Sequence, residues 1–178
     1  MVTPRLETLC TALAQGLIAR KLSMVTAESC TGGLIAASCT HLSGSSAWFE
    51  RGFVTYSNAA KSELLGVPAS LIEAQGAVSE EVAKAMALGA LAHSPAHISV
   101  AVTGIAGPTG GTDAKPVGTV WLAWAWRDSK QVLHSETLLR QFEGTRSEVR
   151  DATAELALAH LSELVGKLLE TTGKKIPT

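Results

Sequence analysis

A hydroxyl and a thiol stand side by side in the stretch TAESCTGG, residues 26–33, as Ser29 and Cys30. The apolar pair Met24-Val25 precedes this stretch, and the apolar run 34–37 follows it, so the pattern predicts a strand, a small-residue turn and a helix. A turn of this kind places side chains and backbone N–H groups at the positive end of a helix, where negative charge is stabilised. The residue types therefore predict nucleophilic chemistry at this turn.

A serine nucleophile needs a base, and the sequence offers Lys61 for that role. Serine is too weak a nucleophile without an adjacent base. The histidines are scattered outside the polar clusters, at His41, His93, His97, His134 and His160. A free lysine titrates near ~10.4, but burial and a neighbouring cation, Arg146 or Arg150, lower that pKa. The alternatives are a helix-capping serine and a solvated lysine.

Cys30 is the rival nucleophile. A thiol at a helix N-terminus has a depressed pKa and is reactive, although free cysteines are most often small buried apolar residues, and we therefore favour Ser29. Cys10 and Cys39 complete an odd set of three cysteines without zinc-type spacing, which indicates free thiols in a reducing compartment.

The glycine-rich segment 103–111 and Arg146 form the predicted binding elements. The segment matches neither GxGxxG nor a P-loop, but Gly104, Gly107, Gly110 and Gly111 allow backbone amides to approach a ligand. A strained connector is the alternative. Arg146, at a predicted helix start, suits a phosphate through its paired N–H donors, and a surface arginine is the alternative there.

The elements that must position these residues follow from apolar periodicity. A packing helix is predicted within 1–20, with Thr3 as its cap and Leu6, Leu9, Leu13, Leu17 and Ile18 on one face. Strands are predicted at 48–57, 98–102, 117–125 and 132–139, and further helices at 34–41, 58–65, 79–93 and from about 146, with Asn58 as a cap and 69–76 as a connector. This order predicts a three-layer α/β/α domain with a mixed sheet, whose polar clusters share one crevice at strand ends.

Length and composition exclude several classes of function. A chain of 178 residues with 46% hydrophobic residues is expected to be one domain, 1–178, with a frayed tail at 172–178. A net charge of −1 argues against nucleic acid and anionic membranes as partners. No apolar run reaches the roughly 18–20 residues of a membrane span, and no signal peptide is recognised, so a cytoplasmic protein is expected. A small anionic substrate stays compatible with this charge.

A series of motifs, in this order, resembles the CinA C-terminal domain family, also called PncC. The motifs are AESCTGG at 27–33, YSNAAK at 56–61, GAVS at 76–79, VTGIAGP at 102–108 and KPVGTV at 115–120. The resemblance covers nearly the whole chain. It implies the fold of that family and hydrolysis of the carboxamide of nicotinamide mononucleotide to nicotinic acid mononucleotide and ammonia, a reaction of pyridine-nucleotide salvage. It also implies that the chain is the stand-alone form, without the N-terminal domain of longer members.

The resemblance also implies roles for residues. It places the family's serine nucleophile on Ser29 and its lysine base on Lys61, and it makes Tyr56, Thr103 and one arginine, Arg146 or Arg150, pocket residues. It implies neither a metal nor another cofactor. Backbone N–H groups near Cys30 and Thr31 are expected to hold the oxyanion, and the remaining expected substrate-binding residues are Gly32, Gly33, Asn58, Gly104, Gly107, Gly110 and Gly111.

Two other functions stay open at this point. The domain would serve as a nucleotide-binding sensor or partner-recruiting module if it bound without turnover, or it would act as an amidase on another small carboxamide. The intact pair of Ser29 and Lys61 favours an enzyme over a module. The tryptophans and the apolar strand at 117–125 suit a self-association surface, so a homo-oligomer is expected.

Overall fold

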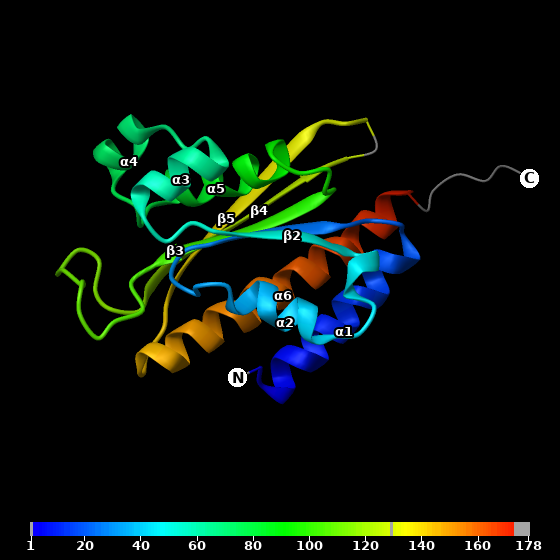
Figure 1. Ribbon diagram of the computed structural model, residues 1–178, viewed down its shortest axis with the longest axis horizontal. Helices are drawn as coiled ribbons and strands as arrows, with labels where there is room; N and C mark the ends of the chain where they lie inside the picture. The colour runs from blue at the N-terminus through cyan, green and yellow to red at the C-terminus, as the bar shows by residue number, and fades with distance from the viewer. Residues whose placement is uncertain (1, 129, 173–178) are drawn as a thin grey trace, which may run out of the picture.

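The computed structural model describes residues 2–128 and 130–172, and its centre is a five-stranded sheet of order β2-β1-β3-β4-β5 (Figure 1). The strands are β1 (Met24–Glu28), β2 (Phe49–Val54), β3 (Ile98–Gly104), β4 (Thr119–Arg127) and β5 (Leu133–Gln141). The helices are α1 (Pro4–Ala19), α2 (Leu34–His41), α3 (Asn58–Leu65), α4 (Ala69–Gln75), α5 (Glu80–Ala92) and α6 (Arg146–Thr172), with a 3-10 turn η1 (Ser45–Ala47).

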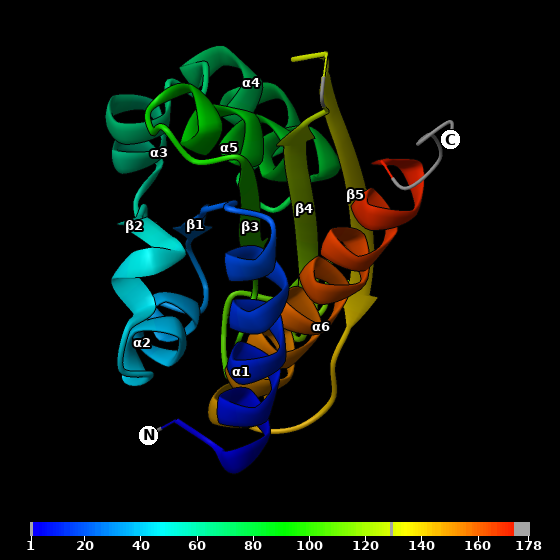
Figure 2. The same ribbon diagram turned by 90° about the vertical axis from the view of Figure 1, so that its right-hand side faces the viewer.

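The sheet is mixed, as the sequence predicts. Strands β2, β1 and β3 run parallel, whereas β4 is antiparallel to β3 and β5 is antiparallel to β4. Every residue of β1 is buried, because the strand has a neighbour on each edge and helices over both faces (Figure 2). Fully covered parallel strands are expected to be apolar on both faces, so the polar Thr26 and Glu28 in β1 need partners inside the protein.

Two helical layers enclose the sheet, which confirms the three-layer α/β/α prediction. Helices α1, α2 and α6 cover one face, and α3, α4 and α5 lie on the other (Figures 1 and 2). The first layer packs Leu6, Leu13 and Leu17 with Met24 of β1, and the second packs α5 against Val25 and Ala27. Successive side chains of β1 point to opposite faces of the sheet, so the strand contributes to two separate hydrophobic cores.

Caps and element ends agree with the sequence in part. Thr3 caps α1, as predicted. Ser79, predicted as the first residue of a helix, is the cap of α5. The prediction of Asn58 as a cap is wrong: Ser57 is the cap, with its hydroxyl accepting a hydrogen bond from the Ala60 N–H at 3.0 Å. Both residue types cap helices well, so their order alone does not decide between them.

The burial of one residue and the bounds of two elements also differ from the expectations. Ile18 is 51% exposed rather than packed with the leucines of α1, and the connector 69–76 contains the helix α4. Thr103 and Gly104 end β3 instead of starting a loop. The predicted frayed tail, 172–178, lies outside the described residues apart from Thr172, the last residue of α6.

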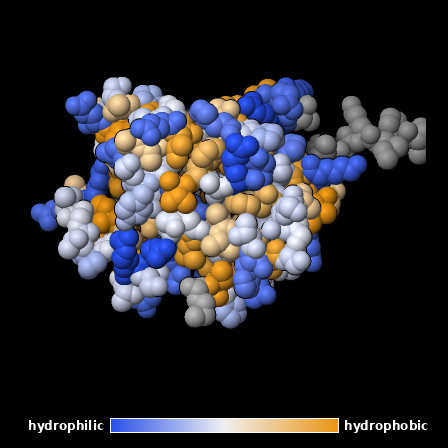
Figure 3. Space-filling view, viewed as in Figure 1, coloured by the Kyte–Doolittle hydropathy of each residue, from blue (hydrophilic) through white to orange (hydrophobic). Residues whose placement is uncertain are grey.

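Little of the predicted self-association surface is exposed in this chain, and the homo-oligomer stays a prediction. Trp48 and Trp124 are buried, and Trp121 and Trp126 are partly buried. The apolar strand β4 lies inside the sheet between β3 and β5. On the face shown in Figure 3, apolar and hydrophilic residues are interspersed. Among the helices of the described residues, none combines the length and apolar character needed to cross a membrane.

Candidate active site

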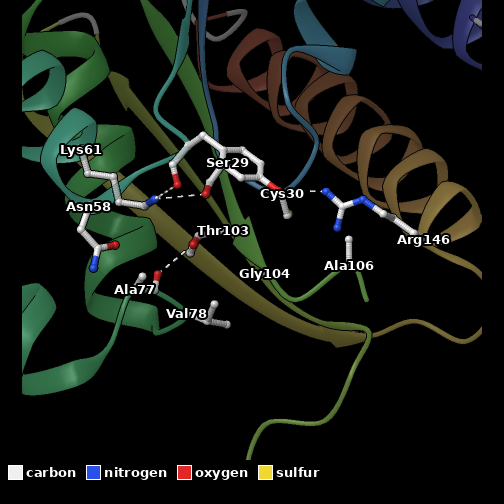
Figure 4. Close-up of a pocket in the computed structure, with 11 residues that line it drawn as sticks. Ser29, Cys30, Asn58, Lys61, Ala77, Val78, Thr103, Gly104, Ala106 and Arg146 are labelled. Carbon is white, nitrogen blue, oxygen red and sulfur yellow. Dashed lines mark hydrogen bonds between the residues drawn. The ribbon is translucent and has the colours of Figure 1, made fainter. Parts of the chain in front are cut away.

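A cavity of about 220 Å³ opens at the carboxyl ends of β1 and β3. After β1 the chain crosses to β2 on one side through α2, and it returns through α3, α4 and α5 to β3 on the other side. Open α/β sheets form their ligand crevices at such a switch point. The lining residues are Ser29, Cys30, Tyr56, Asn58, Lys61, Ala77, Val78, Thr103, Gly104, Ala106 and Arg146 (Figure 4).

Ser29 and Lys61 meet at the floor of this cavity. The Nζ of Lys61 donates a hydrogen bond to Ser29 Oγ at 3.1 Å (Figure 4). It also donates to the Thr55 carbonyl at 2.9 Å. Lys61 is 1% exposed and Ser29 is 8% exposed. Burial lowers the pKa of the Lys61 ammonium below its ordinary value of 10.5, because the charged form loses hydration, and Cys30 opposes this shift. The Ser29 hydroxyl therefore lies within hydrogen-bond distance of a buried amine whose pKa is lowered.

Burial favours the neutral form of Cys30 as well, but for a thiol this means a raised pKa and loss of the reactive thiolate. Burial raises the pKa of its thiol from 9.0 to about 12, backbone hydrogen bonds from Cys30 and Thr31 oppose the shift, and the charge of Glu28 adds to it. The thiol therefore stays protonated at neutral pH and is a poor nucleophile. The expectation of a depressed thiol pKa is wrong because burial disfavours the thiolate. Cys30 is also not at the helix end, since α2 begins only at Leu34.

The positive end of α2 is occupied by a buried carboxylate, that of Glu28. Gly33 occupies the N-cap position of α2, and no side chain caps the helix there. The alternative interpretation of Ser29 as a helix-capping serine is therefore wrong. The Glu28 carboxylate instead accepts hydrogen bonds from the backbone N–H groups of Ile35 at 3.0 Å and Ala36 at 2.8 Å. The partial positive charge at the N-terminus of α2 thus stabilises the buried carboxylate of Glu28.

Tyr56 and Arg146 form the rim. The Arg146 guanidinium donates to the Tyr56 hydroxyl at 2.9 Å and to the Gly107 carbonyl at 2.9 Å. Both side chains are exposed. Arg150, one helical turn further along α6, does not line the cavity and donates instead to the Thr31 carbonyl through Nε at 3.2 Å and Nη2 at 2.7 Å. The structure therefore brings Arg146, of the two candidates, to the cavity.

The wall opposite Ser29 combines β3 with the segment before α5. The Thr103 hydroxyl donates to the Ala77 carbonyl at 2.8 Å. This hydrogen bond joins the end of β3 to the segment before α5. Lys115 donates to the Val78 carbonyl at 2.7 Å and holds the same segment from the loop after β3. Ala77, Val78 and Ala106 carry no reactive group, so only their place in the GAVS and VTGIAGP motifs could have identified them.

Some expected binding residues lie outside the lining. Asn58 and Gly104 do line the cavity. Thr31 is buried and does not line the cavity. The remaining ones outside it are Gly32, Gly33, Gly107, Gly110 and Gly111. Gly32 and Gly33 have φ angles of +59° and +91°, a region that glycine occupies without strain, and they turn the chain into α2.

Comparison with known proteins agrees with this architecture. The family model of the CinA C-terminal domain matches residues 6–165. A Pseudomonas putida protein named nicotinamide-nucleotide amidohydrolase PncC is 52% identical over 159 residues, which are 89% of this chain and 96% of that protein. A protein of the same name from Escherichia coli K12 is 46% identical over 161 residues, covering 90% of this chain and 95% of that protein.

A solved structure shares the fold. The competence/damage inducible protein CihA from Agrobacterium tumefaciens superposes with a TM-score of 0.83 at 42% identity, over 95% of this chain and 98% of that chain. The motif series, the order of elements and these matches agree over the same residues. This chain belongs to the CinA C-terminal domain family.

Proposed function

We propose that this chain is a nicotinamide-nucleotide amidohydrolase that uses Ser29 as nucleophile and Lys61 as base. The proposal rests on relatives of that name, which match nearly the whole chain. The observation that carries the chemistry is the 3.1 Å contact between Lys61 Nζ and Ser29 Oγ on a buried floor. A buried lysine whose pKa is lowered is suited to accept a proton from serine.

The reaction is an acyl transfer in two steps. Neutral Lys61 takes the Ser29 proton while Oγ attacks the carboxamide carbon, and the carbon–nitrogen bond then breaks as Lys61 returns the proton to the departing ammonia. Lys61 then takes a proton from water, whose oxygen attacks the ester carbon, and returns that proton to Ser29 Oγ as the ester bond breaks. The product leaves as a carboxylic acid, which ionises, and both residues are restored. The protonated, buried Cys30 thiol stays out of both steps.

The developing oxyanion needs donors beside Ser29. The backbone N–H groups of Cys30 and Thr31 follow the nucleophile directly, before α2 begins. Their donors would act as an oxyanion hole, in which one donor contributes about 100- to 1,000-fold to the rate. Because Glu28 already uses the end of α2, these turn amides rather than the helix itself would provide the stabilisation.

Arg146 would bind the substrate phosphate. Its guanidinium lies exposed at the rim, where it contacts Tyr56 and the Gly107 carbonyl. Arginine donors match phosphate oxygens in pairs. The mononucleotide is therefore expected to react better than its unphosphorylated riboside.

The test is an ammonia assay on a panel of pyridine compounds. The mononucleotide, its riboside, free nicotinamide, the dinucleotide and glutamine would be compared for wild type, Ser29→Ala and Lys61→Ala. We expect wild type to release ammonia from the mononucleotide and from no other compound of the panel. Both variants should have lost this activity. Near wild-type rates in either variant would remove the assigned pair. Tight binding without any ammonia would favour a binding module, and ammonia mainly from another carboxamide would move the substrate class.

A further inference from the structure

Glu28 is a fully buried carboxylate that the proposed reaction does not use. It is the last residue of β1 and directly precedes Ser29. Its oxygens accept hydrogen bonds from the Thr31 hydroxyl at 2.7 Å and from the N–H groups of Ile35 and Ala36. Burying a carboxylate is costly unless donors surround it, so this site is built around the turn that carries the nucleophile.

Thr31 is held from its other side by Arg150. The guanidinium reaches across from α6 and places two N–H donors, at 2.7 Å and 3.2 Å, on the Thr31 carbonyl. The Thr31 hydroxyl and carbonyl are thus bound by groups from two different elements, β1 and α6. We call Glu28, Thr31 and Arg150 the turn clamp.

The backbone of Ser29 is tied on both sides as well. Its N–H donates to the Val102 carbonyl of β3 at 3.0 Å, and its carbonyl accepts from the Gly32 N–H at 3.1 Å. Lys61 comes from α3, on the other face of the sheet. The distance between Oγ and Nζ therefore depends on where the turn lies relative to α3.

We propose that the turn clamp positions Ser29 for attack, so that Glu28 and Arg150 act on the reaction through Thr31 without touching substrate. The inference rests on the proposed function, because it takes Ser29 as the nucleophile. A misplacement of about 1 Å in a reacting group costs about 100-fold in rate. Tyr56 lies on another segment, and Arg146, one turn before Arg150 on α6, is held by its own contacts to the Tyr56 hydroxyl and the Gly107 carbonyl. Loosening the clamp therefore lowers kcat and leaves KM nearly unchanged.

Thr31→Val is the sharpest test, because valine keeps the shape and removes the hydroxyl that Glu28 binds. We expect kcat for ammonia release to fall about 10- to 100-fold, with KM within about twofold. A fluorophosphonate probe supplies the second readout: its phosphorus bonds to Ser29 Oγ, fluoride leaves, and the serine proton passes to Lys61. The labelling rate should fall with kcat, while the final extent stays near one probe per chain.

The extent of labelling separates positioning from partial unfolding. A merely structural defect would lower the labelled fraction in step with kcat, whereas a misplaced nucleophile lowers only the rate. Thr31→Ser keeps the hydroxyl and should stay within about threefold of wild type in both readouts. Thr26→Val is the matched buried control, since the Thr26 hydroxyl donates to the same carboxylate at 3.4 Å but lies in β1 rather than in the turn.

Arg150→Met tests the clamp from the more accessible side, should Thr31→Val fail to fold. It removes both donors to the Thr31 carbonyl and should lower kcat about tenfold with KM within about twofold. Wild-type kcat and labelling rate in Arg150→Met, or a rise in KM that accounts for its whole defect, would overturn the proposal. A fall in the labelled fraction that matches the fall in kcat would overturn it as well.

The two proposals fail in different ways. If wild type reacts with the probe at Ser29 but releases no ammonia from the mononucleotide, the substrate assignment fails and the labelling rates of the variants still decide the clamp. If the probe leaves Ser29 of wild type unlabelled, the nucleophile is not activated and the clamp proposal is overturned together with the pair.

Discussion

The floor and the rim of the cavity use charge in opposite ways. Lys61, at the floor, is 1% exposed, whereas Tyr56, at the rim, is 60% exposed and shares a hydrogen bond with the exposed Arg146. Burial lowers the pKa of the lysine, so its charge becomes easy to lose. A guanidinium cannot be deprotonated in proteins, so the charge at the rim is permanent.

This difference assigns two tasks to one small cavity. In the proposed reaction the floor supplies the base, and a base must be neutral at the working pH. In the same proposal the rim supplies a fixed positive charge for an anionic substrate, and an exposed charge keeps its hydration. The depth at which a cation lies therefore predicts whether its loss affects kcat or KM.

The largest effect is expected for Lys61→Arg. Arginine keeps the positive charge and the donors at the floor, but it stays protonated and cannot accept the serine proton. We expect kcat for ammonia release to fall at least about 1,000-fold, measured with saturating mononucleotide. Calorimetry should show that the mononucleotide still binds. A variant with more than a tenth of wild-type activity would show that the floor needs only charge and not a base.

The pH profile separates floor and rim next. In the proposed reaction neutral Lys61 is the active form, so kcat/KM should rise with pH and level off above the lysine pKa. That pKa lies below the ordinary 10.5, since burial disfavours the charged form. Below the midpoint the rate should fall about tenfold per pH unit, measured by initial ammonia release in buffers of constant ionic strength. A midpoint at or above 10.5 would contradict a desolvated base.

Arg146→Ala should affect recognition and spare the chemistry. Losing a charge-assisted contact of about 1.5–3 kcal/mol raises KM for the mononucleotide roughly 10- to 100-fold and leaves kcat within about threefold. The riboside, which has no phosphate, is the matched substrate control and should show almost no change. An equal loss with both substrates would mean that Arg146 does not read the phosphate.

The smallest effect is expected for Cys30→Ala. The thiol of Cys30 lines the floor, but its pKa of about 12 keeps it protonated, so it contributes neither charge nor nucleophile. We expect kcat and KM within about threefold of wild type, consistent with the loss of one small buried group. The ammonia assay checks this directly. An inactive Cys30→Ala beside an active Ser29→Ala would move the nucleophile by one residue.

Periodicity identified most elements, and local ambiguity explains the errors. The leucines of α1 and the apolar runs of β3 and β4 leave little choice of structure. The cap of α3 was misplaced because Ser57 and Asn58 are adjacent and both suitable. The short α4 carries a weak pattern, and its burial of Ile72 depends on α5, which no local window contains.

The site shows the same limit. Residue types and motif order singled out Ser29 and Lys61, which the structure brings together. Three of the four expected glycines of the 103–111 segment lie outside the cavity lining, and the sequence left Arg146 and Arg150 equivalent. The two arginines lie one helical turn apart, and only the packing of α6 directs one to the rim and the other to Thr31. The role of Glu28 was missed as well, because a carboxylate that caps a helix from a preceding strand gives no local signal.

The amino-acid sequence by itself determined the layered mixed sheet, the serine at the first turn and the lysine on a short helix, because these depend on local pattern and chemical type. Only the tertiary structure decided that the lysine is buried within hydrogen-bond distance of the serine, that the neighbouring thiol is held protonated, and which arginine lines the cavity. Hydration and distance set those properties, and both arise from segments that meet across the sheet while lying far apart in the chain.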